Sequence, residues 1–360
     1  MTLPKFNKNL EFYHRLVDSI ETRPELLTDY LTPNDRFFVC NAVDAPLVDV
    51  NEYRLRIHGD GVRQALELSY EEIKSLPRHD LVCYLECAGN HRELFDRIKG
   101  EPVLAAEDGF GMTEWTTGGV GNAKWGGVSL HVLLEMAGLD TAAVHVNAKG
   151  LDTGAAEGGV SRPLPLEKAL DPDTLVAWSM NDEPLPVDNG FPLRLIVPGW
   201  VGTSSIKWLG ELVVSMSPVS VSRNTEHYVL IGPEWPADGE VLGEVITEQN
   251  IKSSLALQWN ATLPAGRNII HGNARSPFAP IANVQWSVDE GASWSEASLV
   301  SENTRYSWCL FEFEWEATPG EHGILTRATD TQGNTQPMTI PFNKEGYLFN
   351  QVFSHPVSVS

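Results

Sequence analysis

Residues 81–92 read LVCYLECAGNHR. The first part, from Leu81 to Cys87, has aromatic and β-branched residues between turn signals and predicts a strand. A small-residue turn, an amide and two potentially cationic side chains follow Cys87 at once. Neighbouring positive charge lowers the pKa of a cysteine, and a thiolate is a ligand for soft transition metals. Cys87 is therefore the first candidate for a metal ligand.

The remaining cysteines give no alternative framework. The chain has 4 cysteines, Cys40, Cys83, Cys87 and Cys309, which is too few for a disulfide scaffold of this length. Four residues of strand span about 13 Å, whereas a disulfide needs Cα atoms within roughly 7 Å. We therefore expect Cys83 and Cys87 to share a face of one strand without bonding.

Length and charge restrict the function classes. The chain has 360 residues, which favours two domains, and a net charge of −22 from 26 basic and 48 acidic residues. Such an acidic chain repels phosphate backbones and anionic lipid, so no nucleic-acid or membrane partner is expected. No apolar run approaches the roughly 18 residues of a membrane span. Residues 1–6 lack the features of a secretory signal, and a cytoplasmic location is expected.

The pattern along the chain changes near residue 240. Before it, helix and strand signals mix: residues 129–137 predict a helix and residues 191–197 predict a buried strand. After it, short alternating segments separated by turns predict a β-sandwich of roughly 110 residues. We place the boundary in residues 236–243. The predicted class is α+β, with domains at 1–238 and 239–360.

Two glycine-rich segments have open interpretations. Residues 118–127 lack the spacing of a phosphate or dinucleotide loop and predict a turn. In Gly199–Lys207, two glycines free the backbone, hydroxyls add donors and Lys207 adds charge. This segment fits an anion cradle and a simple polar loop equally well. A cysteine nucleophile with His91 as its base is also conceivable, although no third orienting group is identifiable.

Taken together, several segments resemble one known family. They are Leu31–Asn41, Cys87–Arg92, Gly121–Gly127, Gly150–Asp152, Met180–Pro186, Gly190–Arg194, Val197–Gly199 and Ile206–Gly210, followed by Val288–Trp294, Ala328–Asp330 and Asn334–Pro337. In this order they resemble the sulfite oxidase family of molybdopterin enzymes, from about residue 28 to about residue 350. The resemblance implies a sulfite-oxidase-type molybdopterin-binding domain followed by an immunoglobulin-like dimerisation domain.

The resemblance implies a role for each matching residue. Cys87 matches the only protein ligand of molybdenum, the other sulfurs coming from the pterin dithiolene. Tyr228 matches the active-site tyrosine. Asn189 stands where the family usually has a pterin-contacting histidine. The remaining positions implied to hold the pterin and its phosphate are Asn41, Asp152, Arg194, Ser205, Ile206 and Lys207.

The departures from the family concern the substrate. Cys40 and Cys309 stand where the resemblance places two arginines of the oxoanion pocket, and Arg92 retains the third cation. A thiol cannot replace a bidentate guanidinium, although His91 or Lys124 could compensate. The first expectation is two-electron oxidation of sulfite or a related sulfur compound. The alternative is oxo transfer with a less charged substrate such as a sulfoxide.

The resemblance also implies a homodimer that passes electrons to a separate acceptor. Two other function classes stay open at this point. A non-catalytic binding protein predicts no bound metal, whereas the enzyme predicts about one molybdenum per chain. A cysteine hydrolase predicts inactivation by alkylation without any metal.

Overall fold

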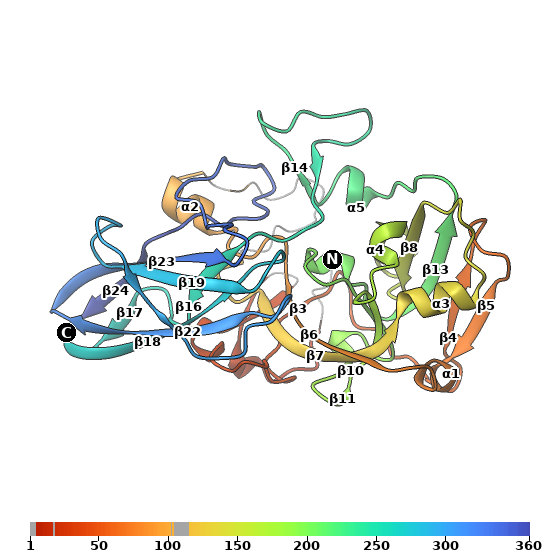
Figure 1. The fold of residues 1–360 in the computed structure, drawn as a ribbon, viewed down its shortest axis with the longest axis horizontal. Helices are drawn as coiled ribbons and strands as arrows, with labels where there is room; N and C mark the ends of the chain where they lie inside the picture. The colour runs from red at the N-terminus through yellow and green to blue at the C-terminus, as the bar shows by residue number, and fades with distance from the viewer. Residues whose placement is uncertain (1–4, 17–18, 102, 104–114) are drawn as a thin grey trace.

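The computed structural model describes residues 5–16, 19–101, 103 and 115–360. Two lobes lie side by side in Figure 1, with the long strands β6 (His79–Glu86) and β7 (Val120–Ser129) between them. Within the described part of the chain, no helix is long and apolar enough to cross a membrane.

The first lobe is built on two five-stranded sheets. One has the order β11-β10-β7-β6 with β12 paired to β10, and the other has the order β5-β4-β13-β8-β9. Their other strands are β4 (Arg54–His58), β5 (Leu66–Ser69), β8 (His145–Gly150), β9 (Ser161–Pro165), β10 (Leu175–Met180), β11 (Glu183–Pro184), β12 (Arg194–Ile196) and β13 (Leu209–Ser215). Smaller sheets join β1 (Tyr13–Arg15), β2 (Ser19–Thr22) and β3 (Val39–Cys40), and β14 (Val229–Leu230) with β15 (Glu244–Val245).

Short helices connect these strands. They are α1 (Tyr70–Lys74), α2 (Leu94–Lys99), α3 (Leu130–Met136), α4 (Leu166–Ala169) and α5 (Ser222–Thr225), with 3-10 turns η1 (Leu10–Phe12), η2 (Pro24–Leu26), η3 (Ala156–Gly158), η4 (Val187–Asn189) and η5 (Gly202–Ser204). The predicted helix at 129–137 is confirmed as α3, whose apolar face, including Leu130 and Leu133, is fully buried. The predicted strand at 191–197 is shorter, since β12 covers only residues 194–196 between two prolines that lack an N–H.

The turn predicted at residues 118–127 is wrong, because most of that segment is strand β7. It pairs antiparallel with β6 along the whole of β6, from His79 opposite Gly127 to Glu86 opposite Val120. Its glycines serve close packing rather than chain reversal. A Cβ on Gly127 would lie 2.3 Å from the carbonyl oxygen of Val176, far inside van der Waals contact.

The second lobe is the predicted β-sandwich. One sheet has the order β16-β18-β22-β21 and the other β17-β24-β23-β19-β20. Their bounds are β16 (Lys252–Leu255), β17 (Ala261–Leu263), β18 (Gly266–Arg275), β19 (Ile281–Ser287), β20 (Ser295–Glu296), β21 (Ser298–Leu299), β22 (Cys309–Ala317), β23 (Gly320–Asp330) and β24 (His355–Val359). Alternate residues of β22 are buried, including Phe311 and Phe313, which confirms the alternation expected of a strand with one core face.

The boundary between the domains stays a prediction. Residues 236–243 lie in the loop that joins β14 to β15.

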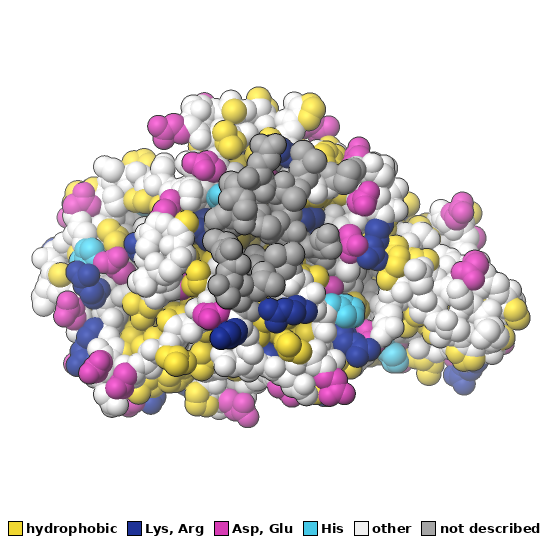
Figure 2. All heavy atoms as spheres, turned by 180° about the vertical axis from the view of Figure 1, so that it is seen from behind, with side chains coloured by type: hydrophobic (Ala, Val, Ile, Leu, Met, Phe, Trp, Pro, Cys, Tyr) yellow, Lys and Arg dark blue, Asp and Glu magenta, His cyan; other side chains and the backbone are white. Residues whose placement is uncertain are grey.

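On the face shown in Figure 2, Asp and Glu side chains are scattered over both lobes instead of gathering in one patch.

Candidate functional site

A single cavity collects every site residue that the sequence predicted. It lies where the C-terminal end of β6 meets the loops after β12 and around α5, and it encloses about 1330 Å³ with its open mouth included. The predicted residues that line it are Asn41, Cys87, Arg92, Asp152, Asn189, Arg194, Ser205, Ile206, Lys207 and Tyr228.

Cys87 directly follows β6 and is held by its backbone. Its N–H donates to Gly119 O at 2.9 Å, and its carbonyl accepts from Asn90 N at 3.0 Å. The neighbouring Cys40 thiol and burial raise the pKa of the Cys87 thiol, and Arg92 offsets this only in part. The lowered pKa expected from the sequence is therefore wrong for the protein alone. A bound metal removes such a proton directly.

The four cysteines are all free, as expected. Cys83 is fully buried in the core beside β7, and burial raises the pKa of its thiol. Among the residues the structure describes, no cluster of three or more His, Cys, Asp or Glu side chains could hold a metal ion.

One end of the cavity is a cationic cradle. Lys207 Nζ donates to Cys40 O at 2.9 Å, to Asp188 O at 3.0 Å and to Asn41 Oδ1. Burial and the nearby Arg194 lower the pKa of Lys207 to about 7, and burial lowers the pKa of Arg194 to about 9. Within the described ranges, no carboxylate forms an ion pair with Lys207 or Arg194; the buried ion pairs there involve other cations, such as Lys252 and Arg275.

Unsatisfied polar atoms show that this cradle fits an anionic, hydrogen-bonding cofactor. Asn41 Nδ2 and Arg194 Nε, both on cavity-lining residues, are buried without a hydrogen-bond partner. Such groups are costly to leave unpaired, and desolvated cations are stabilised by phosphate oxygens. Ser205 Oγ accepts from Val197 N at 3.1 Å, which leaves its own O–H to donate. The residues present therefore fit a phosphate-bearing pterin.

Three further predicted residues complete this end. Asp152 Oδ1 accepts from Val160 N at 3.0 Å, which fixes the carboxylate at the cavity wall. Asn189 Oδ1 accepts from Lys8 Nζ at 2.8 Å, so its amide nitrogen stays available as a donor. Ile206 lines the cavity and also packs into the core of the first lobe.

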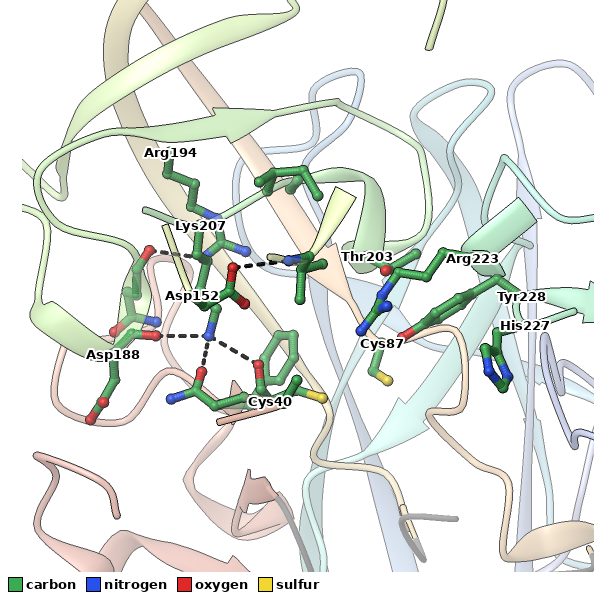
Figure 3. A pocket seen from close by; sticks show the side chains of 18 of the residues that line it. Cys40, Cys87, Asp152, Asp188, Arg194, Thr203, Lys207, Arg223, His227 and Tyr228 are labelled. Carbon is green, nitrogen blue, oxygen red and sulfur yellow. Dashed lines mark hydrogen bonds between the residues drawn. The ribbon is translucent and has the colours of Figure 1, made fainter. Parts of the chain in front are cut away.

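The other end of the cavity surrounds Cys87. Figure 3 shows Arg194, Lys207, Asp152 and Asp188 at one end, and Cys87, Arg223, Tyr228 and His227 at the other. Arg223 projects from α5, and its backbone carbonyl accepts from Arg162 Nη1 at 2.5 Å. The sequence reasoning missed Arg223 and His227. Their signal was available, because both lie in the same short stretch as Tyr228.

The expectation for Cys309 is wrong. Cys309 begins strand β22 in the sandwich, where it is buried and donates to Leu310 O at 3.5 Å. It does not line the cavity, whereas Cys40 does. The proposed replacements also fail: Lys124 pairs with Asp182 at 2.8 Å, and His91 is buried 3.1 Å from Ser254 Oγ. Arg223 instead brings a second guanidinium to the cavity, and the His227 side chain lines the same cavity.

The position of His91 also counts against a cysteine hydrolase. His91 does not line the cavity that Cys87 faces. Burial, Lys252 and Arg275 hold the pKa of His91 well below its ordinary value. Its ring packs edge-on against Phe349 and Phe353, so it is a neutral core residue.

Behind Cys87, the two lobes are joined by buried charges. The Glu86 carboxylate accepts from Arg275 Nε and Nη2 and from Lys252 Nζ, each at 2.8 Å. All three side chains have 0% exposure. Gln249 Nε2 donates to the Glu86 carbonyl at 2.7 Å. The sandwich thus supplies the support for the residue that precedes Cys87.

Comparisons with known proteins agree with this geometry. Residues 42–222 match the family model described as oxidoreductase molybdopterin binding domain, and residues 250–360 match the Mo-co oxidoreductase dimerisation domain. The mitochondrial sulfite oxidase of Rattus norvegicus is 33% identical over 92% of this chain and 62% of its own length. The sulfite oxidase of Gallus gallus is 32% identical over 91% of this chain and 73% of its own length.

The fold matches a solved structure as well. The sulfane dehydrogenase SoxCD from Paracoccus pantotrophus superposes with a TM-score of 0.79 and 25% identity, covering 93% of this chain and 83% of that chain. The present chain spans about 62% of the length of the mammalian relatives it matches. The fold, the cavity and these matches agree, and the chain belongs to the sulfite oxidase family of molybdopterin oxidoreductases.

Proposed function

We propose that the protein is a molybdenum enzyme that oxidises sulfite or a related sulfur oxoanion and passes the electrons to a separate acceptor. The observation that carries this proposal is the pair of guanidinium groups at the Cys87 end of the cavity, opposite the cofactor cradle. Arg92, Arg223 and His227 line the cavity beside Cys87. Side chains of this kind bind oxoanions by charge-assisted and bidentate hydrogen bonds.

The same observation argues against the less charged substrate. The sulfoxide alternative depended on the loss of two pocket arginines at Cys40 and Cys309. Cys309 lies in the sandwich core, and Arg223 brings a guanidinium to the cavity from a different element. Among the described residues that line the cavity, this end includes the guanidinium groups of Arg92 and Arg223 and the carboxylate of Glu345.

The bound molybdopterin would supply the two-electron oxo transfer. Cys87 would hold the metal through its sulfur, while the cradle of Asn41, Arg194 and Lys207 would hold the pterin and its phosphate. Arg92 and Arg223 would orient the substrate oxygens. Burial raises the pKa of Tyr228, so its hydroxyl stays protonated at neutral pH and can donate a hydrogen bond next to Cys87.

The metal and the role of Cys87 can be tested together. We expect about one molybdenum per chain by elemental analysis of the purified protein, and a fluorescent pterin released on denaturation. Cys87→Ser should abolish sulfite oxidation and leave the folded structure intact. The matched control is Cys309→Ser, a buried thiol outside the cavity, which should retain both metal and turnover. Turnover retained by Cys87→Ser would refute the assignment.

The substrate class is tested at Arg223. A hydrogen bond to a charged group contributes about 1.5–3 kcal/mol, so Arg223→Met should raise KM for sulfite by roughly 10–150-fold. The KM of the native enzyme should also rise with ionic strength. A native enzyme that reduces a sulfoxide efficiently, is unaffected by salt and shows no sulfite oxidation would favour the alternative.

We also propose that the protein is a homodimer. Support comes from residues 250–360, which match a dimerisation domain. Light scattering on the intact protein should give about twice the mass of one 39.7 kDa chain. A monomer at micromolar concentration would contradict this.

A further inference from the structure

Four side chains from distant parts of the sequence form one continuous stack at the Cys87 end of the cavity, where the substrate is proposed to bind. The guanidinium carbon of Arg162 lies 5.4 Å from the ring centroid of Tyr228. The rings of Tyr228 and Tyr347 are stacked, 5.3 Å apart with an interplanar angle of 12°. The guanidinium carbon of Arg92 lies 5.0 Å from the Tyr347 centroid. Tyr347 is therefore an inner member of the stack and lies between Tyr228 and Arg92, the two side chains predicted to meet substrate.

Tyr347 belongs to the segment between β23 and β24, and that segment is built to present it. Asn343 Nδ2 donates to Tyr347 O and Asn343 Oδ1 accepts from Tyr347 N, both at 2.9 Å. Gly346 has φ 63°, a conformation that favours glycine. A Cβ there would also lie 2.7 Å from Arg92 Cγ.

The same segment is fastened to the Cys87 loop. Leu348 N donates to Ala88 O at 2.8 Å, and Asn250 Nδ2 donates to Leu348 O at 3.0 Å. Tyr347 itself is 7% exposed and lines the cavity. Its position relative to Cys87 is thus set by one backbone hydrogen bond to the Cys87 loop and one hydrogen bond from the Asn250 side chain.

From this geometry we infer that Tyr347 is a positioning residue for the oxoanion substrate, which it serves by holding the Arg92 guanidinium and the Tyr228 ring at the cavity. An arginine loses rotamer freedom when it is fixed, and an aromatic face attracts a guanidinium in a partly desolvated site. With Tyr347 in place, that ordering is complete before substrate arrives. The second lobe then contributes directly to substrate recognition.

The inference rests on the proposed function only for the identity of the oxoanion, so the experiment uses sulfate, a non-reacting oxoanion, and calorimetric binding to the intact protein. Tyr347→Leu removes the ring and should weaken sulfate binding by about tenfold. Tyr347→Phe keeps the ring and should restore the Kd to within about twofold. The matched control is Tyr70→Leu, which removes a comparable contact with Lys74 at 4.7 Å outside the cavity and should leave the Kd unchanged.

A double variant tests whether Tyr347 acts through Arg92. In an Arg92→Met background, Tyr347→Leu should cause no further loss of sulfate affinity, because the group it positions is gone. A purely structural role predicts a lower Tm for Tyr347→Leu with an unchanged Kd in the folded protein, and that result would overturn the inference. Additive losses in the double variant would overturn it as well. Failure of native enzyme to oxidise sulfite, with sulfate binding behaving as described, would overturn the proposed function alone.

Discussion

The buried charges behind Cys87 give a quantitative prediction for Glu86→Gln. In the native protein, the Glu86 carboxylate is the common partner of Lys252 and Arg275, and no part of the three side chains reaches solvent. The substitution preserves the shape of the side chain but removes its charge. Two cations are then left in the interior without a compensating anion.

The expected cost follows from burial. Removing one partner of a buried ion pair destabilises a protein by about 3–5 kcal/mol, because the remaining charge stays desolvated. The exposed pair Arg267–Glu314, at 2.6 Å with 66% and 56% side-chain exposure, is the matched control. Glu314→Gln should cost at most about 1 kcal/mol. The contrast between the two glutamates isolates the effect of burial.

The effect should also depend on pH. Burial alone raises the pKa of the Glu86 carboxyl, but Arg275 and Lys252 together outweigh it and hold the pKa below its ordinary value of 4.5. The folded carboxyl therefore keeps its charge to lower pH than the unfolded one. Its stabilisation is complete above about pH 4.5 and is lost as the pH falls through the folded pKa.

Urea unfolding of native and variant proteins at several pH values is the assay. We expect a loss of about 3–5 kcal/mol in the free energy of unfolding at pH 7 for Glu86→Gln, and a smaller difference as the pH falls below about 4.5. A loss at pH 7 no larger than that of Glu314→Gln would refute the reasoning.

Two further predictions concern the cradle and the central strand pair. Because the pKa of Lys207 is lowered to about 7 in the folded protein, folding without cofactor is penalised most at and below pH 7, and less as the pH rises toward the unfolded value near 10.4. Lys207→Met should therefore stabilise the cofactor-free protein at pH 7, and urea unfolding should show that this gain shrinks toward pH 10. The purified variant should contain less molybdenum than the native protein. An unchanged or lower free energy of unfolding at pH 7 would contradict the prediction. Gly127→Ala places a Cβ 2.3 Å from a carbonyl oxygen and should lower the free energy of unfolding by about 1–3 kcal/mol or more. The control Gly154→Ala meets only contacts of 3.5 Å or longer and should be nearly neutral in the same assay. Equal effects of the two substitutions would show that packing at β7 is not the reason for the glycine.

Local pattern was sufficient for two elements of the first lobe. The strand that ends before Cys87 and the helix at 130–136 follow from residue type and periodicity over a few neighbours. The turn predicted at 118–127 was wrong because Gly127 is required by close packing against the carbonyl oxygen of Val176, far along the chain, and not by a local chain reversal. Local rules contain no information about such a contact.

The candidate site divides in the same way. Ordered motifs were enough to name the residues of the cofactor cradle, and the cavity brings them together. Cys309 was misplaced because a similar position in a sequence does not ensure a similar position at a pocket. The support of Glu86 by Lys252 and Arg275 joins residues separated by 166 and 189 positions, and no spacing rule predicts it.

By itself, then, the sequence determined the α+β class, the sandwich and the choice of Cys87 as the metal-ligand candidate. These follow from strand alternation and short motifs, which involve residues close together in the chain. Only the tertiary structure decided which side chains share the cavity with that thiol: Arg223 and His227 come from α5 and the residues just after it, and Tyr347 comes from the second lobe. The physical reason is that electrostatic and aromatic contacts act through space over a few ångströms, and the folded packing of the two lobes sets those distances.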